Sequence, residues 1–373
     1  MSNEAVNNPR SSVARFHWML PKAGEVSIGG PQSPREAAHY RLASTRDGSP
    51  APIPDIRGWT AFGRRAEESG IESVLVSFSK YEPDPILVIA ALGQRTAKLK
   101  FIAAYRSGLM KPATFVQQVN TVSAFMPGRI ALNIVAGSST AEQRGYGDYL
   151  AHDERYARAG EFLEVCHSFW RGNGDVSFDG KYYQVDQGKL HTPLFANGRA
   201  TPEIYISGHS AQAEQLALSK GTCLLRVADT VENLKPAVAR VREHGIEVCL
   251  RMCVICRPTR SEAIDVAESL LPQDDMGQYE RSVAVKNDSQ MYREASEVED
   301  KWLSPVLWKG FVRYYGPVWT TLLGSYDDVA RALLEYKEIG VTQFIMSGWP
   351  ELDEVTTFGN EVVTRVRRAE AAT

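Results

Sequence analysis

Eight short apolar runs, separated by segments of helical periodicity, limit the folds open to this chain more than any other feature. The runs are apolar on both faces or nearly so, as expected for parallel strands covered by side chains inside and helices outside. Eight strands that alternate with helices favour a closed α/β architecture, the (β/α)8 TIM barrel. The predicted strands are residues 15–20, 73–77, 99–105, 129–136, 203–207, 222–227, 247–255 and 342–347.

Two features of the intervening segments support this closed barrel. Ser325 to Asp328 offers a helix N-cap with acidic first-turn residues, and Gly340 ends the helix that follows. Gly70 to Ser77 and Gly340 to Ser347 form a weak repeat, in which a helix leads into a strand that ends in serine. The repeat indicates that one β/α unit is used twice.

Four connections are longer than barrel loops require, so we expect one barrel domain, residues 1–373, with insertions. Phe178 to Tyr182 predicts the turn of a hairpin in the third connection. The fourth is predicted to hold helices plus a loop, and its aromatic residues suit a lid over the barrel. The insertions are predicted at residues 22–55, 137–151, 175–201 and 270–323.

Composition argues against several classes of partner. The chain has 42 Lys and Arg against 45 Asp and Glu, so no overall positive field would gather nucleic acid or an anionic membrane. No apolar run approaches the roughly 18 residues that span a bilayer. The polar start, Met1 to Ser12, lacks the apolar region of a signal peptide. We therefore expect a cytoplasmic protein that binds neither nucleic acid nor membrane.

The cysteines and histidines do not indicate a metal site. The five cysteines are an odd number and lie mostly in apolar strand or helix patterns, which favours reduced thiols. Cys253 and Cys256 have a metal-like spacing, but no second pair of Cys or His completes a zinc site. We interpret this pair as structural and predict no metal.

Small and polar residues follow several predicted strands, where a (β/α)8 barrel places its functional groups. Asn133 can both donate to and accept from a heterocycle. Ser207 to Ser210 precedes a helix whose free amides and dipole favour a phosphate, although an ordinary N-cap explains the same residues. His152 to Tyr156 opens another helix and by itself is typical of a capped, solvated first turn.

In this order, the residues resemble the bacterial luciferase-like flavin-dependent monooxygenases. The similarity is greatest to the alkanesulfonate monooxygenase branch, with its dimethylsulfone monooxygenase and pyrimidine oxygenase relatives, and it runs from Phe16 to the last helix. The resemblance implies a luciferase-like (β/α)8 barrel with insertions. The most specific motifs read PGRIALNIVAGS at 127–138, HDERY at 152–156, FDGKY at 178–182, YISGHS at 205–210 and SGWP at 347–350.

The same resemblance implies a set of cofactor-binding positions. It places Ser207, Gly208 and Ser210 around a flavin phosphate, which favours the phosphate interpretation over a simple cap. The ring and ribityl chain would lie against four further residues, and two more would line the ring. These are Asn133, Ser138, His152 and Tyr156, then Ser77 and Ala104.

The positions that handle sulfonate in that branch are only partly kept. Arg251 is retained and is our first candidate for orienting an anionic or strongly polar substrate, with Arg226 as a weaker second. Glu82 would repel a sulfonate, so we expect a small organic molecule, either another organosulfur compound or a biosynthetic intermediate. The other changed or lid positions are Cys253, where relatives have His, Trp349, where they have Tyr, Tyr315, which aligns with their loop arginine, and Arg313 nearby.

The resemblance predicts a two-component monooxygenase. FMN would arrive reduced (FMNH2) from a separate NAD(P)H-dependent flavin reductase, and O2 would form a peroxyflavin in a water-excluding pocket. Relatives pair through helices outside the barrel, so a homodimer or homotetramer is expected. Two alternatives remain: an F420-dependent oxidoreductase on the same barrel, and a flavin-binding protein without turnover.

Overall fold

The computed structural model describes residues 13–21, 55–80, 82–137, 139–172, 174–271, 301–312 and 316–372. Eight parallel strands form a closed barrel, because the strand order runs from β9 through β12, β1, β2, β3, β4 and β7 to β8, and β8 pairs with β9 again. The strands are β1 (Arg15–Met19), β2 (Ser73–Val76), β3 (Lys100–Arg106), β4 (Ile130–Val135), β7 (Glu203–Ser207), β8 (Cys223–Val227), β9 (Glu247–Arg257) and β12 (Gln343–Ser347). All eight predicted strands are confirmed, with bounds within two residues of the prediction.

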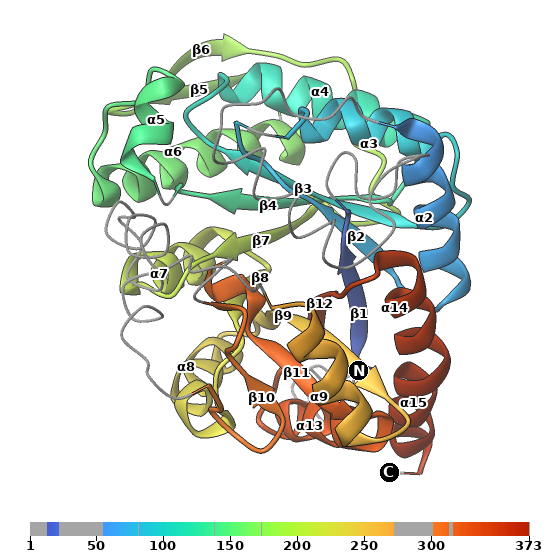
Figure 1. The fold of residues 1–373 in the computed structure, drawn as a ribbon. Coiled ribbons are helices and arrows are strands. Elements are labelled where there is room, and N and C mark those ends of the chain that lie inside the picture. The colour runs from blue at the N-terminus through green and yellow to red at the C-terminus, as the bar shows by residue number, and fades with distance from the viewer. Residues whose placement is uncertain are drawn as a thin grey trace.

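Helices surround the strands, with α2, α14 and α15 on one side of the view in Figure 1 and α7 and α8 on the other. The N-terminal and C-terminal ends of the described chain meet, since the Ala14 N–H donates to Glu370 at 2.7 Å. The helices are α2 (Ile56–Glu68), α3 (Pro85–Gly93), α4 (Pro112–Phe125), α6 (His152–Arg171), α7 (Ala211–Lys220), α8 (Val231–Glu243), α13 (Tyr326–Glu338), α14 (Glu351–Thr357), the π-helix η3 (Phe358–Val363) and α15 (Thr364–Ala371).

The predicted N-cap and repeat are confirmed. Ser325 and Asp328 form a reciprocal capping box at the start of α13, and Gly340 follows that helix with φ of 108°. Both repeated segments lead from a helix into a barrel strand, β2 and β12.

Side chains alternate along each strand between the lumen of the barrel and the layer of helices. The lumen set forms its own buried cluster, and the outer set packs with the helices in the main core. This alternation decides which strand residues can reach a ligand inside the barrel. The buried lumen residues are Leu75, Ile102, Ala104, Ala131, Tyr205, Cys223, Leu225, Cys249 and Ile345.

At the amino end of the lumen, Arg15 donates to three carboxylates. It makes two bonds of 2.9 Å to Glu72, bonds of 2.5 and 2.9 Å to Glu203, and a longer one of 3.4 Å to Glu247. Bonds from Arg15 and Lys100 outweigh the effect of burial and hold the pKa of Glu72 at about 2. The barrel is therefore closed below by a saturated ion-pair network.

The insertions are partly as predicted. The hairpin is confirmed as β5 (Val176–Asp179) and β6 (Gln184–Gly188), and residues 137–151 carry the short helix α5 (Thr140–Gly145). Most of residues 270–323, for which helices plus a loop are predicted, lie outside the described residues. After residue 300 the structure describes 301–312 and 316–323 of this insertion. That part holds β10 (Leu307–Trp308), the 3-10 turn η2 (Pro317–Trp319) and the start of β11 (Thr321–Ser325).

The extra strand has a physical cause in the length of β9. Residues 249–253 of β9 pair with β12, whereas residues 253–257 pair in parallel with β11. The second half of β9 thus leaves the barrel and offers an edge, which β11 fills. The helix α9 (Arg260–Ser269) covers this extension.

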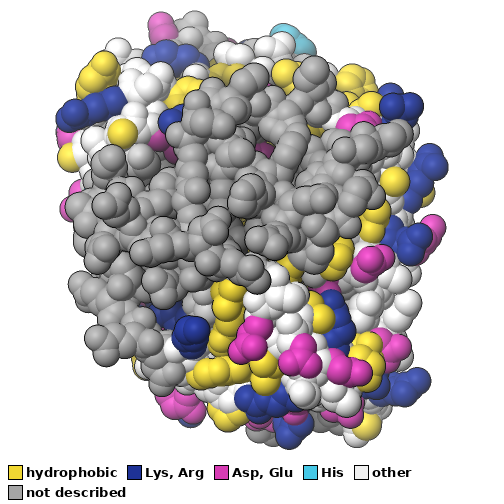
Figure 2. All heavy atoms as spheres, viewed as in Figure 1, with side chains coloured by type: hydrophobic (Ala, Val, Ile, Leu, Met, Phe, Trp, Pro, Cys, Tyr) yellow, Lys and Arg dark blue, Asp and Glu magenta, His cyan; other side chains and the backbone are white. Residues whose placement is uncertain are grey.

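The five cysteines are buried and free of disulfides. Among the described residues, no helix is long and apolar enough to cross a membrane. Figure 2 shows acidic and basic side chains of described residues interspersed over the visible face, without a broad region of one sign.

Candidate functional site

The carboxyl ends of the barrel strands bring several predicted residues to the lumen. Ala104 and Asn133 are paired neighbours on β3 and β4, and both are buried. The hydroxyl of Ser207, at the end of β7, donates to the side-chain oxygen of Asn133 at 2.6 Å. Ser77 directly follows β2 and is half-buried. Asn133 and Ser207 thus form a hydrogen-bonded polar pair at the carboxyl end of the lumen, and Ala104 lies beside Asn133.

The loop from Ser207 to Ser210 is shaped by its contacts with two helices. Ser210 is the N-cap of α7, and its hydroxyl accepts from the Ala213 N–H at 3.2 Å. The Tyr156 hydroxyl donates to the Ser207 carbonyl at 3.4 Å. Burial raises the pKa of Tyr156, against the opposing effect of a hydrogen bond with Ser210. Tyr156 therefore remains a neutral donor beside the start of α7.

Gly208 is required by the space in this loop. A Cβ at this position would lie 2.5 Å from the Ala213 Cβ and 2.7 Å from the Tyr156 hydroxyl oxygen. Its N–H donates to the Leu225 carbonyl on the neighbouring strand at 3.1 Å. Glycine lets this loop pack closely against Tyr156 and the amino end of α7, and we call the loop and this helix end the cradle, because helix amides and dipole there suit an anionic oxygen.

His152 lies beside this cradle. It is the first residue of α6, one turn before Tyr156, and the two rings have centroids 5.1 Å apart. Its Nδ1 is 2.9 Å from the carboxylate of Asp153, and its side chain is 35% exposed. This partly exposed imidazole can thus reach a ligand that enters at the carboxyl end of the barrel.

Arg251 and Cys253 meet Ser347 inside the lumen. Arg251 is buried, and its guanidinium donates to the Met252 carbonyl at 2.5 Å and to the Ser347 hydroxyl at 2.9 Å. The Cys253 sulfur is 3.0 Å from the same hydroxyl. The structure therefore brings the first substrate candidate together with one of the changed positions.

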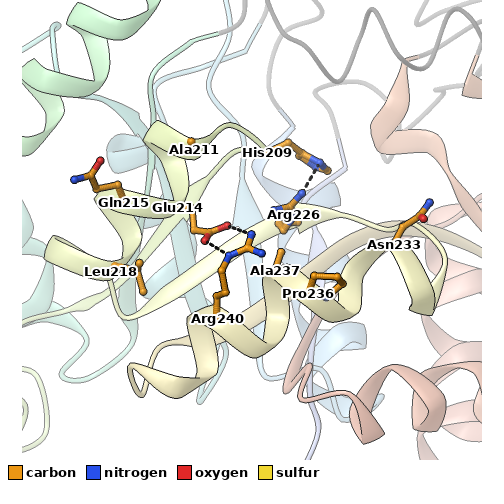
Figure 3. Close-up of a pocket in the computed structure, with 10 residues that line it drawn as sticks. All are labelled: His209, Ala211, Glu214, Gln215, Leu218, Arg226, Asn233, Pro236, Ala237 and Arg240. Atoms are coloured by element: carbon orange, nitrogen blue, oxygen red, sulfur yellow. Dashed lines mark hydrogen bonds and ion pairs between the residues drawn. The ribbon is translucent and has the colours of Figure 1, made fainter.

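Arg226 does not join this group. It lies on the outer face of β8 and, with His209, lines a cavity of about 670 Å³ between α7 and α8 (Figure 3). His209 accepts from the Val227 N–H through Nε2 at 2.9 Å, and its Nδ1 is 3.4 Å from Arg226. Burial, with the nearby Arg226 charge, lowers the pKa of His209 to about 4. This cavity opens away from the lumen.

Trp349 also lies apart from the lumen cluster. It is buried in a second core with Trp308 and Phe311, over the extension of β9. The ring centroids of Trp308 and Phe311 are 4.8 Å apart, and those of Phe311 and Trp319 are 6.0 Å apart. These insertion aromatics pack on one another, on α9 and on the extension of β9.

The remaining predicted positions are placed as follows. Glu82 is half-buried in the loop after β2, with its N–H bonded to the Ser79 carbonyl at 3.0 Å. Three positions fall outside the described residues, namely Ser138, Arg313 and Tyr315. Within the described part of the chain, no group of three or more His, Cys, Asp or Glu side chains could hold a metal ion.

Arg106 is a candidate that the sequence analysis did not select. It ends β3 in the same register as Ala104, is 6% exposed, and makes a 3.0 Å ion pair with Glu142 of α5. The sequence could have indicated Arg106, because it is an arginine at the end of an apolar strand, in the register of residues that face the lumen.

Comparisons with known proteins agree with this architecture. A model of the luciferase-like monooxygenase family matches residues 16–343. The EDTA monooxygenase of Chelativorans sp. BNC1 has a similar structure, with a TM-score of 0.75 and 20% identity over 96% of this chain and 94% of that one.

Two further solved structures differ in the chemistry that their descriptions give. A riboflavin lyase, solved with modified FMN and its substrate riboflavin, gives a TM-score of 0.73 at 17% identity over 96% of this chain and 92% of that one. An F420-dependent secondary alcohol dehydrogenase gives 0.65 at 18% identity over 95% and 99%. At these identities the likeness shows a shared fold.

Proposed function

The chain belongs to the luciferase-like monooxygenase family and is an oxidoreductase, and from this premise we propose that it is a two-component monooxygenase that uses FMNH2 and O2. The observation that carries the flavin assignment is the loop cradle at Gly208, where packing against Ala213 and Tyr156 leaves no room for a Cβ. It adjoins the amino end of α7 and the neutral hydroxyl of Tyr156, a donor set that fits a phosphate. The residues present therefore fit FMN.

The reduced flavin supplies the two electrons with which O2 is activated and one oxygen atom is inserted into the substrate. The chain's own residues bind and orient. Ser207, Gly208 and Ser210 would hold the phosphate, while Asn133 and Ala104 would lie under the ring. The buried and largely apolar cluster of lumen residues below them would exclude water from the reacting atoms.

Arg251 would orient the substrate through an anionic or strongly polar oxygen. Two of its donors already bind Met252 and Ser347, which fixes the guanidinium. The substrate class is a small organosulfur compound or biosynthetic intermediate. A flavin reductase would supply FMNH2, and we propose a homodimer or homotetramer, which sedimentation analysis would test.

The test is anaerobic titration with FMNH2 followed by rapid mixing with O2. Bound reduced flavin should reoxidise more slowly than free FMNH2, because the lumen shields it, and flavin absorbance follows this directly. FMN should also bind more tightly than riboflavin, which lacks the phosphate. Equal affinity for both flavins, or reoxidation at the rate of free FMNH2, would contradict the proposal.

A matched pair of alanine variants isolates the cradle. Gly208→Ala should weaken FMN binding about fivefold or more, because the added Cβ displaces Tyr156 or the start of α7, where the phosphate is proposed to bind, at a cost of about 1–3 kcal/mol. Gly160→Ala is the control, because its Cβ on the same helix as Tyr156 would meet only the Leu216 Cδ1 at 3.9 Å. Equal FMN affinity in the two variants would show that the cradle does not hold the cofactor.

A second candidate is an F420-dependent oxidoreductase, favoured by the similarity of fold to the F420-dependent alcohol dehydrogenase. Such an enzyme transfers hydride and needs no O2. Anaerobic turnover of candidate alcohols with F420 and without FMN would support this alternative. Tight FMNH2 binding without F420 binding would exclude it.

A further inference from the structure

Arg106 is a buried cation at the rim of the barrel with incomplete hydrogen bonds. Nη2 pairs with Glu142 at 3.0 Å, whereas Nε and Nη1 are buried and have no hydrogen-bond partner. A buried donor without an acceptor costs on the order of 1–3 kcal/mol. Stability of the fold therefore does not explain these two free donors, and a ligand acceptor would.

The guanidinium is held in a fixed plane. Its central carbon lies 4.9 Å from the centroid of the Phe78 ring and 5.7 Å from that of Tyr146. Glu142 is itself fixed, because its carboxylate accepts from the Lys80 N–H at 2.8 Å and Ser139 caps its own N–H. The donors are thus preorganised by α5 and by the loop after β2.

The neighbours of Arg106 indicate the class of acceptor. Arg106 shares β3 and the lumen register with Ala104, and its Cα pairs with Val135 of β4, two residues beyond Asn133. These strand ends are where the flavin ring is proposed to lie. Since Glu142 already compensates the charge, the free N–H groups suit a planar carbonyl oxygen or a delocalised anion.

We propose that Arg106 donates to the carbonyl edge of the flavin pyrimidine ring and so binds reduced FMN more tightly than oxidised FMN. Reduction adds negative charge to that edge, and N–H donors held in place bind the more negative acceptor more strongly. The inference rests on the proposed function, because it takes FMN as the ligand of the barrel.

The test measures the affinity of oxidised and dithionite-reduced FMN and the reduction potential of the bound flavin. Arg106→Met should weaken reduced FMN about tenfold more than oxidised FMN, as expected for loss of a charge-assisted hydrogen bond. For a two-electron couple, a tenfold change lowers the potential by about 30 mV. Arg106→Lys keeps the charge without the planar fork and should give an intermediate shift.

Arg158→Met is the matched control. Arg158 lies on α6, is half-buried, and pairs with Asp148 of the same insertion at 2.5 Å. The Arg158→Met variant should leave the reduction potential of bound FMN unchanged. An unshifted potential in Arg106→Met, or an equal shift in Arg158→Met, would overturn the role of Arg106. Failure of the unmodified protein to bind either form of FMN would instead overturn the proposed function.

Discussion

At the amino end of the barrel Arg15 donates to three carboxylates, whereas at the carboxyl end Arg106 donates to one and leaves two nitrogen atoms without an acceptor. Both arginines lie in lumen register on inner strands. At the amino end the charged groups bind one another, whereas at the carboxyl end two N–H donors remain available to a ligand. The difference separates a region that stabilises the barrel from a region built to bind.

The largest expected effect is on stability at the amino end. Arg15→Met leaves Glu72, Glu203 and Glu247 close together without their common partner, which should cost about 3–5 kcal/mol. Urea denaturation at pH 7 measures this loss. FMN affinity of the protein that remains folded should not change.

The comparison at the carboxyl end uses a double variant. Arg106→Met/Glu142→Gln removes both members of the ion pair and the two free donors, so its stability should stay within about 1 kcal/mol of the original. If the double variant loses as much stability as Arg15→Met, both ends of the barrel serve stability, and the distinction between a stabilising end and a binding end is wrong.

The sequence predicted the barrel because eight apolar runs carry their own signal. It did not predict β11, because that strand depends on the free edge that β9 offers outside the barrel. It also did not separate Arg226 from Arg251. In strand β8 both faces are apolar, so the pattern alone does not show that Leu225 faces the lumen and Arg226 the helices.

The sequence also could not predict that two donor atoms of Arg106 have no hydrogen-bond partner. Their state depends on Glu142, Phe78 and Tyr146, which come from two separate loops and meet only in the folded barrel. The Ser207 to Ser210 loop could be predicted from the sequence, because its small residues and its helix N-cap are neighbours along the chain.

Acid should destabilise the protein in part through His17, at the amino end of the barrel. This ring is buried between the Ser73 hydroxyl and the Gln343 side chain, and burial together with the Arg15 charge lowers its pKa to about 4. The unfolded chain gains a proton near pH 6.5, but the folded chain does not. Stability is therefore complete above about pH 6.5 and should fall by about 3 kcal/mol as the pH drops to 4.

The measurement is the urea midpoint between pH 7.5 and 4, compared with His17→Gln, in which this proton uptake is absent. His209, at the other end of the barrel, also has a pKa of about 4 and adds a similar slope. The variant should keep roughly half of the pH dependence from these two rings. A profile identical to that of the original protein would show that His17 is not the buried base.

The smallest effect distinguishes two helix caps. Ser210 caps α7 beside the proposed phosphate cradle, and Thr230 caps α8 by the same side-chain bond, at 3.3 Å to the Asn233 N–H. Replacing either by alanine should cost about 1 kcal/mol of stability. Only Ser210→Ala should also weaken FMN binding, measured by fluorescence titration, because only its hydroxyl lies where the phosphate is proposed to bind. Equal FMN affinity in Ser210→Ala and Thr230→Ala would show that Ser210 is an ordinary helix cap and that the FMN phosphate does not bind at the start of α7.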